Sequence, residues 1–312
     1  MNSLTRKERR LGEWLIEKSL IAAGVSSVLI IVLIFVFLFK EAILFFNTAH
    51  VSQLIGKWVY DAWDEKNIYN MMWQPVSNEP KYSFIPLICG SFLVSFPATV
   101  LAAIVGVGCA VYLSEIASPR MREFFKPVVE LLAGIPSVVL GFFMLAIFAS
   151  LLQDVFHTQY RLNAFVGAIG IGIATLPIII TISEDALQAV PKELRNASYA
   201  LGATRWQTVF GTVLPAAVSG ISASIILGFG RALGETMIVL MATGNAAITT
   251  GNIFSSVRTM TATLAAELGE VAQGEEHYYA LFLVGAVLFT FTFILNLISE
   301  SILSKARAKL RM

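Results

Sequence analysis

The stretch of residues 184–215 reads EDALQAVPKELRNASYALGATRWQTVFGTVLP and holds the start and stop signals of two short helices. Pro191 suits the first turn of a helix, where its missing N–H group costs nothing. Gly202 supplies the flexible position that ends this first helix. Thr204 and Gln207 have the spacing of a capping box, which starts a second helix. The pattern predicts two helices joined by a glycine elbow, with Pro215 at the start of the next apolar segment.

The rest of the chain is much more apolar than a soluble protein. Of its 312 residues, 56% are hydrophobic and 14% are charged, whereas about a quarter are charged in soluble domains. A membrane helix needs about 20 mostly apolar residues. Six blocks meet this requirement, namely 20–39, 84–113 (interrupted at Pro97), 128–152, 165–182, 216–243 and 279–303. The sequence therefore predicts an all-α integral membrane protein with six transmembrane helices.

The first apolar block follows a cluster of basic residues, as in a signal peptide. However, its apolar run is too long for a signal peptide, and no clear small-residue cleavage site follows. We therefore expect an uncleaved membrane anchor.

Lysine and arginine residues in the short loops predict the orientation in the membrane. Fifteen of them lie on the side of the chain termini and six on the other side. We therefore expect both termini and the 184–214 loop to be cytoplasmic. The predicted organisation is a cytoplasmic segment 1–19, a first transmembrane helix 20–40, a periplasmic or extracellular loop 41–83, a membrane core 84–304 and a basic cytoplasmic tail 305–312.

Several classes of function have no support in the sequence. A net charge of +1 predicts no nucleic-acid partner, and two cysteines within an apolar block predict no disulfide framework. His50, His157 and His277 lack the spacing of metal ligands and are expected to be solvated loop residues. No G-x-x-x-x-G-K-[ST] phosphate-binding loop is present. We predict a chain that is not an enzyme and binds no metal or cofactor.

The 184–214 loop is open to two interpretations. Composition alone is compatible with an ordinary helical connector. The pattern, however, resembles the "EAA" loop of ABC importer permeases, E-A-A-x-x-x-G followed nine residues later by I-x-L-P. The matching residues are Asn196, Ala197, Ser198, Tyr199, Ala200, Leu201 and Gly202, then Thr212, Val213, Leu214 and Pro215.

This resemblance implies a docking role for the loop. In that family the loop helix lies in a groove on a cytoplasmic ATPase subunit and transmits its motion. Two positions depart from the pattern, because Asn196 replaces the glutamate and Thr212 replaces the isoleucine. The contacts that the family's carboxylate makes are therefore in question here.

The fifth apolar block contains two opposite charges, in the stretch ILGFGRALGETMIVLMATGN from Ile226 to Asn245. Arg231 and Glu235 are spaced i, i+4, so on a helix they can form an ion pair. One interpretation is a structural pair that neutralises itself. Desolvation offsets much of the Coulomb gain of such a pair, and ionisable groups inside a membrane commonly mark a substrate path. Gly228, Gly230 and Gly234 leave room for close helix packing or a break.

The chemistry of this pair suggests its substrate. Arginine binds carboxylate or phosphate through a planar fork of donors. The neighbouring carboxylate of Glu235 repels a fully ionised anion, but it can accept a hydrogen bond from a protonated oxyanion. The pair should therefore suit phosphate better than sulfate, which carries no proton at neutral pH.

Four stretches resemble the PstC-type permease subunits of phosphate-specific ABC importers. They are Gly230–Thr236 with Gly244 and Asn245, Glu130–Ser137 with Gly141, Trp63–Tyr69, and Ile85–Leu87 with Gly90 and Ser91. The resemblance covers most of the chain from about residue 60. It implies a six-helix, MetI-like type I permease core at 84–304, with the candidate substrate path at Arg231, Gly234, Glu235 and Thr236.

The same resemblance implies partners and a location. It implies a second, PstA-like permease subunit, a dimeric PstB-like ATPase that uses ATP, and an external PstS-like phosphate-binding protein. The location would be the plasma membrane of a bacterium or archaeon. In that family, the arginine and glutamate at the positions of Arg231 and Glu235 are implicated in phosphate passage.

Glu130 and Pro136 are further candidates near the cytoplasmic end of the third block. Glu130 is either part of the path or a carboxylate at a helix end, where charge costs little. Gly134 and Pro136 are expected to permit a bend or close packing.

The mechanism expected from this resemblance is alternating access, with ATP biasing two states of the bundle. The alternatives are the A-type subunit, a permease for sulfate or molybdate, an ion-gradient-driven transporter or channel, and a membrane protein that signals phosphate status.

Overall fold

The structure is a computed structural model that describes residues 3–48, 51–61 and 66–310. The predictions made for His50, for residues 63–65 of the Trp63–Tyr69 stretch and for Arg311 fall outside these ranges. Within them, six helical segments are long and apolar enough to cross a membrane. These segments are Glu13–Asn47, Ile85–Ile116, Ser137–Phe156, Ala164–Gln188, Arg205–Leu233 and Glu276–Ile302.

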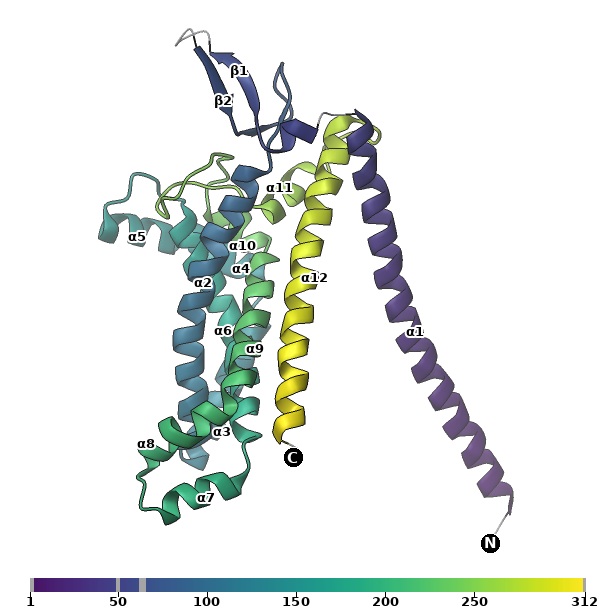
Figure 1. The fold of residues 1–312 in the computed structure, drawn as a ribbon, viewed down its shortest axis with the longest axis vertical. Coiled ribbons are helices and arrows are strands. Elements are labelled where there is room, and N and C mark those ends of the chain that lie inside the picture. The colour runs from purple at the N-terminus through teal and green to yellow at the C-terminus, as the bar shows by residue number, and fades with distance from the viewer. Residues whose placement is uncertain (1–2, 49–50, 62–65, 311–312) are drawn as a thin grey trace.

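Helix α6 (Ala164–Gln188) is the centre of the bundle. It packs against α2 (Ile85–Val111) and α9 (Leu214–Leu233), and α12 (Glu276–Leu310) packs on the other side of α9 (Figure 1). Small residues allow α6 and α9 to approach closely. A Cβ atom placed on Gly228 would lie 2.8 Å from Cδ1 of Ile179. Gly228 therefore serves close helix packing, as its sequence predicts.

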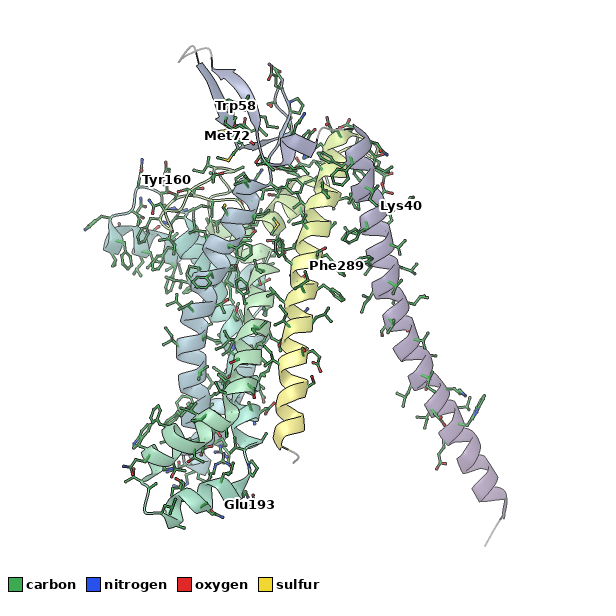
Figure 2. All side chains as sticks on the ribbon, viewed as in Figure 1. Lys40, Trp58, Met72, Tyr160, Glu193 and Phe289 are labelled. Atoms are coloured by element: carbon green, nitrogen blue, oxygen red, sulfur yellow. The ribbon has the colours of Figure 1, made fainter. Side chains whose placement is uncertain are left out.

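Helix α1 (Ser3–Thr48) stands at the edge of the bundle. It contacts α12 near its C-terminal end and diverges from it toward the N-terminus (Figure 1). None of the residues in its apolar window is buried, and its side chains project freely along most of the helix (Figure 2). Over this window the helix is apolar all round and buries no face, which suits a lipid environment.

The third membrane segment differs from the prediction of one helix over 128–152. α3 (Pro119–Gly134) is a separate helix that buries none of its residues. Ile135 and Pro136 are extended, with ψ of 122° and 136°. The segment itself consists of α4 (Ser137–Phe143), the π-helical turn η3 (Met144–Phe148) and α5 (Ala149–Phe156). A proline disfavours the helical conformation in the residue before it, so the chain breaks at Pro136 instead of bending.

The fifth segment begins earlier and ends earlier than the predicted 216–243. α8 (Arg205–Thr208) continues through the π-helical turn η4 (Val209–Val213) into α9, so Pro215 lies inside a continuous helical segment. The N–H group of Leu214 bonds to the carbonyl of Val209 across this widened turn. A widened turn accommodates the proline ring and its missing donor. At its other end α9 stops at Leu233, and α10 (Met237–Ala242) is a separate helix.

One end of the molecule, here named the hairpin face, is built from short elements. Two antiparallel hairpins pair β1 (Lys57–Asp61) with β2 (Lys66–Asn70) and β3 (Trp73–Gln74) with β4 (Lys81–Tyr82). The 3-10 turn η1 (Val51–Leu54) and α11 (Met260–Glu267) lie nearby (Figure 1). Their core holds buried Phe45, Trp73, Tyr82, Leu87 and Leu281. The segment 41–83, predicted as a loop, thus contains the end of α1 and both hairpins.

The opposite end of the molecule is named the terminal face. It carries α7 (Lys192–Ala200), α8 and the end of α2, which continues as the π-helical turn η2 (Tyr112–Ile116). Figure 2 shows Glu193 of α7 at this end and Trp58 and Met72 at the opposite end. The described ends of α1 and α12 also point toward the terminal face. The predicted docking loop 184–214 and the predicted basic segments at the two termini therefore lie on one side of the bundle.

Candidate functional site

The charged motif of the fifth segment lies at a break between two helices. α9 ends at Leu233, Gly234 is its C-cap, and Thr236 is the N-cap of α10. Gly234 has φ of −84°, a conformation open to any residue, so the helix ends here without a left-handed cap. Side chains satisfy the freed backbone groups, as a break inside a membrane bundle requires. The N–H of Thr236 donates to the Glu235 carboxylate at 3.2 Å, and the hydroxyl of Thr261 donates to the Glu235 carbonyl at 2.7 Å.

Arg231 and Glu235 do form an ion pair across this break. Nη1 of Arg231 lies 3.4 Å from Oε2 of Glu235. The two side chains differ in exposure, at 39% for Arg231 and 5% for Glu235. Within the described part of the chain, Glu235 is the one hydrogen-bonding partner of the Arg231 side chain. The buried carboxylate therefore backs a guanidinium group that keeps most of its donors unused.

The exposed side of the Arg231–Glu235 pair, here called the open edge, runs along the break between α9 and α10. Arg231 and Gly234 are exposed and Thr236 is half-buried. The Thr236 hydroxyl makes only a long hydrogen bond, 3.4 Å, to the Gly234 carbonyl. Helix α4, which packs against α10, exposes Val139 and Phe142. Arg231 and Thr236 thus both keep donors available at the break, and the sequence-predicted path residues do lie together.

The 184–214 segment folds as its capping signals predict. Gly202 has φ of +84°, and the N–H groups of Gly202 and Ala203 bond to the carbonyls of Tyr199 and Ser198. This is the Schellman arrangement that ends a helix. Both hydrogen bonds of the Thr204 and Gln207 capping box are present, at 3.4 and 2.8 Å. Local sequence signals are strong here because each acts within one turn of helix.

Helix α7 exposes most of the residues that match the EAA pattern. Leu201 at the elbow is 90% exposed, and Asn196, Ala197, Tyr199 and Ala200 are also exposed. Ser198 faces inward, where its hydroxyl lies 2.9 Å from that of Thr208. Leu214 packs in the core beneath, while Pro215 is exposed.

Two aromatic residues extend this exposed surface along the next helix. Trp206 and Phe210 stack with ring centroids 5.8 Å apart, and both are more than half exposed. Exposed apolar groups gathered on one face mark an interaction surface. The shape and exposure of this region suit a docking element on the terminal face.

Glu130 lies on α3 and Pro136 at the start of α4, outside the segment that forms the Arg231 break. Glu130 is exposed on α3 and lines a shallow hollow of about 340 Å³ with Arg122, Glu123, Lys126 and Pro127. Pro136 is the N-cap of α4. Because α3 is not part of the third membrane segment, Glu130 is a helix-surface carboxylate on the terminal side. A path role for Glu130 stays a prediction.

Sequence reasoning missed a polar cluster at the hairpin face. Glu267 accepts hydrogen bonds at 2.9 Å from the Trp73 indole and is bonded at 2.9 Å to the His277 ring, and it also pairs with Arg258. Burial alone would raise the pKa of Glu267, but the hydrogen bonds from His277 and Trp73 and the charge of Arg258 lower it overall. The prediction of a solvated His277 is therefore wrong, since its ring is buried and bonded.

This cluster lines a cavity of about 680 Å³ on the hairpin face. Its members come from two distant parts of the chain, because Trp73 and Glu267 are 194 positions apart. No local spacing could have indicated this grouping.

The arrangement of spans, break and elbow defines a class of membrane transport protein. The chain belongs to the family described as binding-protein-dependent transport system inner membrane component, which it matches over residues 102–307. It is a multi-pass membrane protein with the fold of ABC importer permeases. The matched region contains both the α7 elbow and the Arg231 break.

Among relatives, the chain is 34% identical to the probable ABC transporter permease protein YqgH of Bacillus subtilis, over 76% of this chain and 77% of the relative. It is 34% identical to the phosphate transport system permease protein PstC of Mesorhizobium japonicum, with the same two coverages. It is 30% identical to PstC of Pasteurella multocida, over 88% of this chain and 89% of that protein.

Solved structures show the same fold at lower identity. The inward-facing MetNI methionine ABC transporter matches 71% of this chain and 96% of its own, with a TM-score of 0.55 and 17% identity. A bacterial ABC transporter involved in alginate import matches 99% of both chains, with a TM-score of 0.52 and 16% identity. The expected MetI-like permease fold is thus confirmed.

Proposed function

We propose that this chain is a permease subunit of an ATP-driven phosphate importer and forms half of the translocation path. The observation that carries the proposal is the Arg231–Glu235 pair, in which a buried carboxylate backs a half-exposed guanidinium at a helix break. Relatives named as phosphate transport system permeases support the choice of substrate class.

The exposure of Arg231 argues for a path. An arginine in contact with lipid at membrane depth costs several kcal/mol. Figure 1 shows the end of α9 and α10 at a level between the two ends of α12. Arg231 therefore has to face water or another protein surface, and a second permease subunit across the open edge would enclose a polar passage.

The donor and acceptor inventory favours a protonated oxyanion. Arg231 offers several N–H donors, and Thr236 adds a hydroxyl on the same edge. Glu235 can accept a proton-bearing oxygen of phosphate, while the same carboxylate repels sulfate, which has no proton to donate. The pair would thus select phosphate over sulfate in two ways, because Arg231 attracts the anion and Glu235 repels an anion that has no proton.

The terminal face would bind the partner ATPase and take up its ATP-driven motion. The exposed residues of α7 and the stacked Trp206–Phe210 surface suit docking to a cytoplasmic ATPase dimer. The excess of Lys and Arg on this side supports a cytoplasmic location for the terminal face and both termini, by the positive-inside rule. The cell would be bacterial or archaeal, as for the relatives named above. ATP hydrolysis would belong to the partner and not to this chain.

The mechanism we propose is alternating access. ATP binding closes the partner ATPases, and α7 passes this motion to the span bundle. An outward-open state accepts phosphate from an external binding protein, and an inward-open state releases it past Arg231. ATP can drive this cycle only if it binds the two states with different affinity.

Uptake of labelled phosphate into vesicles that hold the full complex tests the proposal. We expect uptake to require ATP and to favour phosphate over sulfate. Glu235→Gln should reduce that preference by about tenfold, because the loss of one charge-assisted contact amounts to about 1.4 kcal/mol or more. Uptake that ignores ATP and follows an ion gradient would contradict the proposal, and equal transport of sulfate by the wild type would contradict the choice of substrate.

A further inference from the structure

Arg195 on α7 joins three elements of the terminal face. Its Nη2 and Nε atoms donate to the two carboxylate oxygens of Glu115 at 2.7 and 3.3 Å. The same guanidinium donates to the carbonyls of Leu187 at 2.8 Å and Val190 at 2.5 Å. Glu115 lies in η2 at the end of α2, and Leu187 lies at the end of α6. One side chain therefore ties α7 to the ends of the two helices that form the centre of the bundle.

The geometry of this contact is that of a rigid link. A two-point contact between guanidinium and carboxylate fixes orientation as well as distance. The exposed fractions are 16% for the Arg195 side chain and 9% for that of Glu115, so water screens the pair little. The turn η2 is also held by Arg122, which lines the same hollow as Arg195 and donates to the carbonyls of Leu113 and Ser114 at 2.7 to 2.9 Å.

The other side-chain link of α7 runs to α8. It is the hydroxyl pair of Ser198 and Thr208 at 2.9 Å. Within the described residues, the bonds from Arg195 are the side-chain hydrogen bonds that connect α7 to α2 and α6. Helix α6 in turn packs along α9, which carries Arg231. A contiguous series of contacts thus runs from α7 to the Arg231 break.

We propose that Glu115 is a positioning residue for ATP-driven transport: through Arg195 it holds α7 on the ends of α2 and α6, so that displacement of α7 moves these helices. The inference rests on the proposed function. It also bears on Asn196, which stands where the family pattern has a glutamate. Asn196 lines the same hollow, of about 480 Å³, as Glu115 and Arg195, so the carboxylate of this region comes from η2 and not from α7.

The test measures phosphate transported per ATP hydrolysed by the full complex in vesicles. Glu115→Gln keeps the shape and one acceptor oxygen, so we expect assembly and ATP hydrolysis to persist. Phosphate moved per ATP should fall by about tenfold, within the range of energetic couplings between distant sites. Arg195→Gln should show a similar fall. The double variant should be no worse than either single one, because residues that act as one unit are not additive.

Glu123→Gln is the matched control, because Glu123 is an exposed carboxylate on the same face. Its ratio of phosphate to ATP should equal that of the wild type. If Glu115→Gln does not assemble, Glu115→Asp takes its place and should give an intermediate ratio.

The outcomes separate this inference from the proposed function. A wild-type ratio in an assembled Glu115 variant, or additive losses in the double variant, would overturn the role of Glu115 and leave ATP-driven uptake intact. Wild-type uptake that does not depend on ATP would instead overturn the proposed function, and the role of Glu115 with it.

Discussion

Two arginine–glutamate pairs of this chain have the same chemistry and very different surroundings. The Arg195–Glu115 pair is short, at 2.7 Å, and both side chains are largely buried. The Arg231–Glu235 pair is longer, at 3.4 Å, and its arginine is 39% exposed. Arg195 also binds two backbone carbonyls, whereas Glu235 is the one hydrogen-bonding partner of Arg231 among the described residues.

The difference shows how one type of ion pair can serve as a link or as a binding site. A guanidinium such as that of Arg195, which makes four hydrogen bonds with its five donors, holds two elements together. A guanidinium with spare donors beside a buried carboxylate can take a ligand without leaving a charge unpaired. What distinguishes the two cases is the set of donors that remains free, which a sequence does not show.

The comparison of the two pairs predicts that substitution of Arg195 causes the largest loss of stability. Arg195→Met should lower the stability of the complex by about 3–5 kcal/mol, because breaking a buried pair leaves Glu115 as an unpaired charge. Arg231→Met is the matched variant and should cost less, about 1–3 kcal/mol. It too leaves a buried carboxylate without its partner, but the broken contact is longer, at 3.4 Å, and Arg231 binds no backbone carbonyl among the described residues. Thermal unfolding of the purified complex in detergent measures both. Equal losses of stability in the two variants would contradict the distinction between Arg195 as a structural link and Arg231 as a binding site.

A third pair, Arg258–Glu267 at the hairpin face, should make the stability of the protein depend on pH, and the expected effect is smaller. The folded-state pKa of Glu267 lies below its ordinary value of 4.5. The ionised carboxylate therefore stabilises the fold above the unfolded pKa, and this contribution is lost as the pH falls through the folded pKa. The melting temperature of Glu267→Gln should lie below that of the wild type at neutral pH, and the gap should close in acid.

Glu270→Gln is the control for the pH test, because Glu270 is exposed on the rim of the same cavity. Its melting temperature should follow that of the wild type at every pH. A gap for Glu267→Gln that widens in acid would show that the Trp73–His277–Glu267 network does not favour the ionised form.

Features set by neighbours in the chain could be predicted from the sequence. The Gly202 elbow and the Thr204 capping box act within one turn, and the i, i+4 spacing brought Arg231 and Glu235 together as expected. The six apolar segments follow from hydropathy alone. The sequence was less informative about where helices stop inside apolar segments, because apolar residues continue through the breaks at Pro136 and Gly234.

Features set by distant parts of the chain could not be predicted. Glu115 and Arg195 are 80 positions apart, and only the packing of α2 against α6 brings them together. The network around Glu267 depends on the β3–β4 hairpin, and no pattern within 41–83 predicted a hairpin there. Long-range pairs need the tertiary fold, whereas caps and elbows do not.

The most direct test of the Arg231 site is ATP-dependent phosphate uptake by Arg231→Gln at matched membrane levels, with Arg231→Lys beside it. The glutamine variant should assemble and yet lose uptake by at least about a hundredfold, since a charge-assisted contact to an anion is worth roughly 1.5–3 kcal/mol for each bond. The lysine variant should retain part of the activity, because it keeps the charge without the planar fork. Normal uptake by an assembled Arg231→Gln complex would make the pair structural and contradict the account.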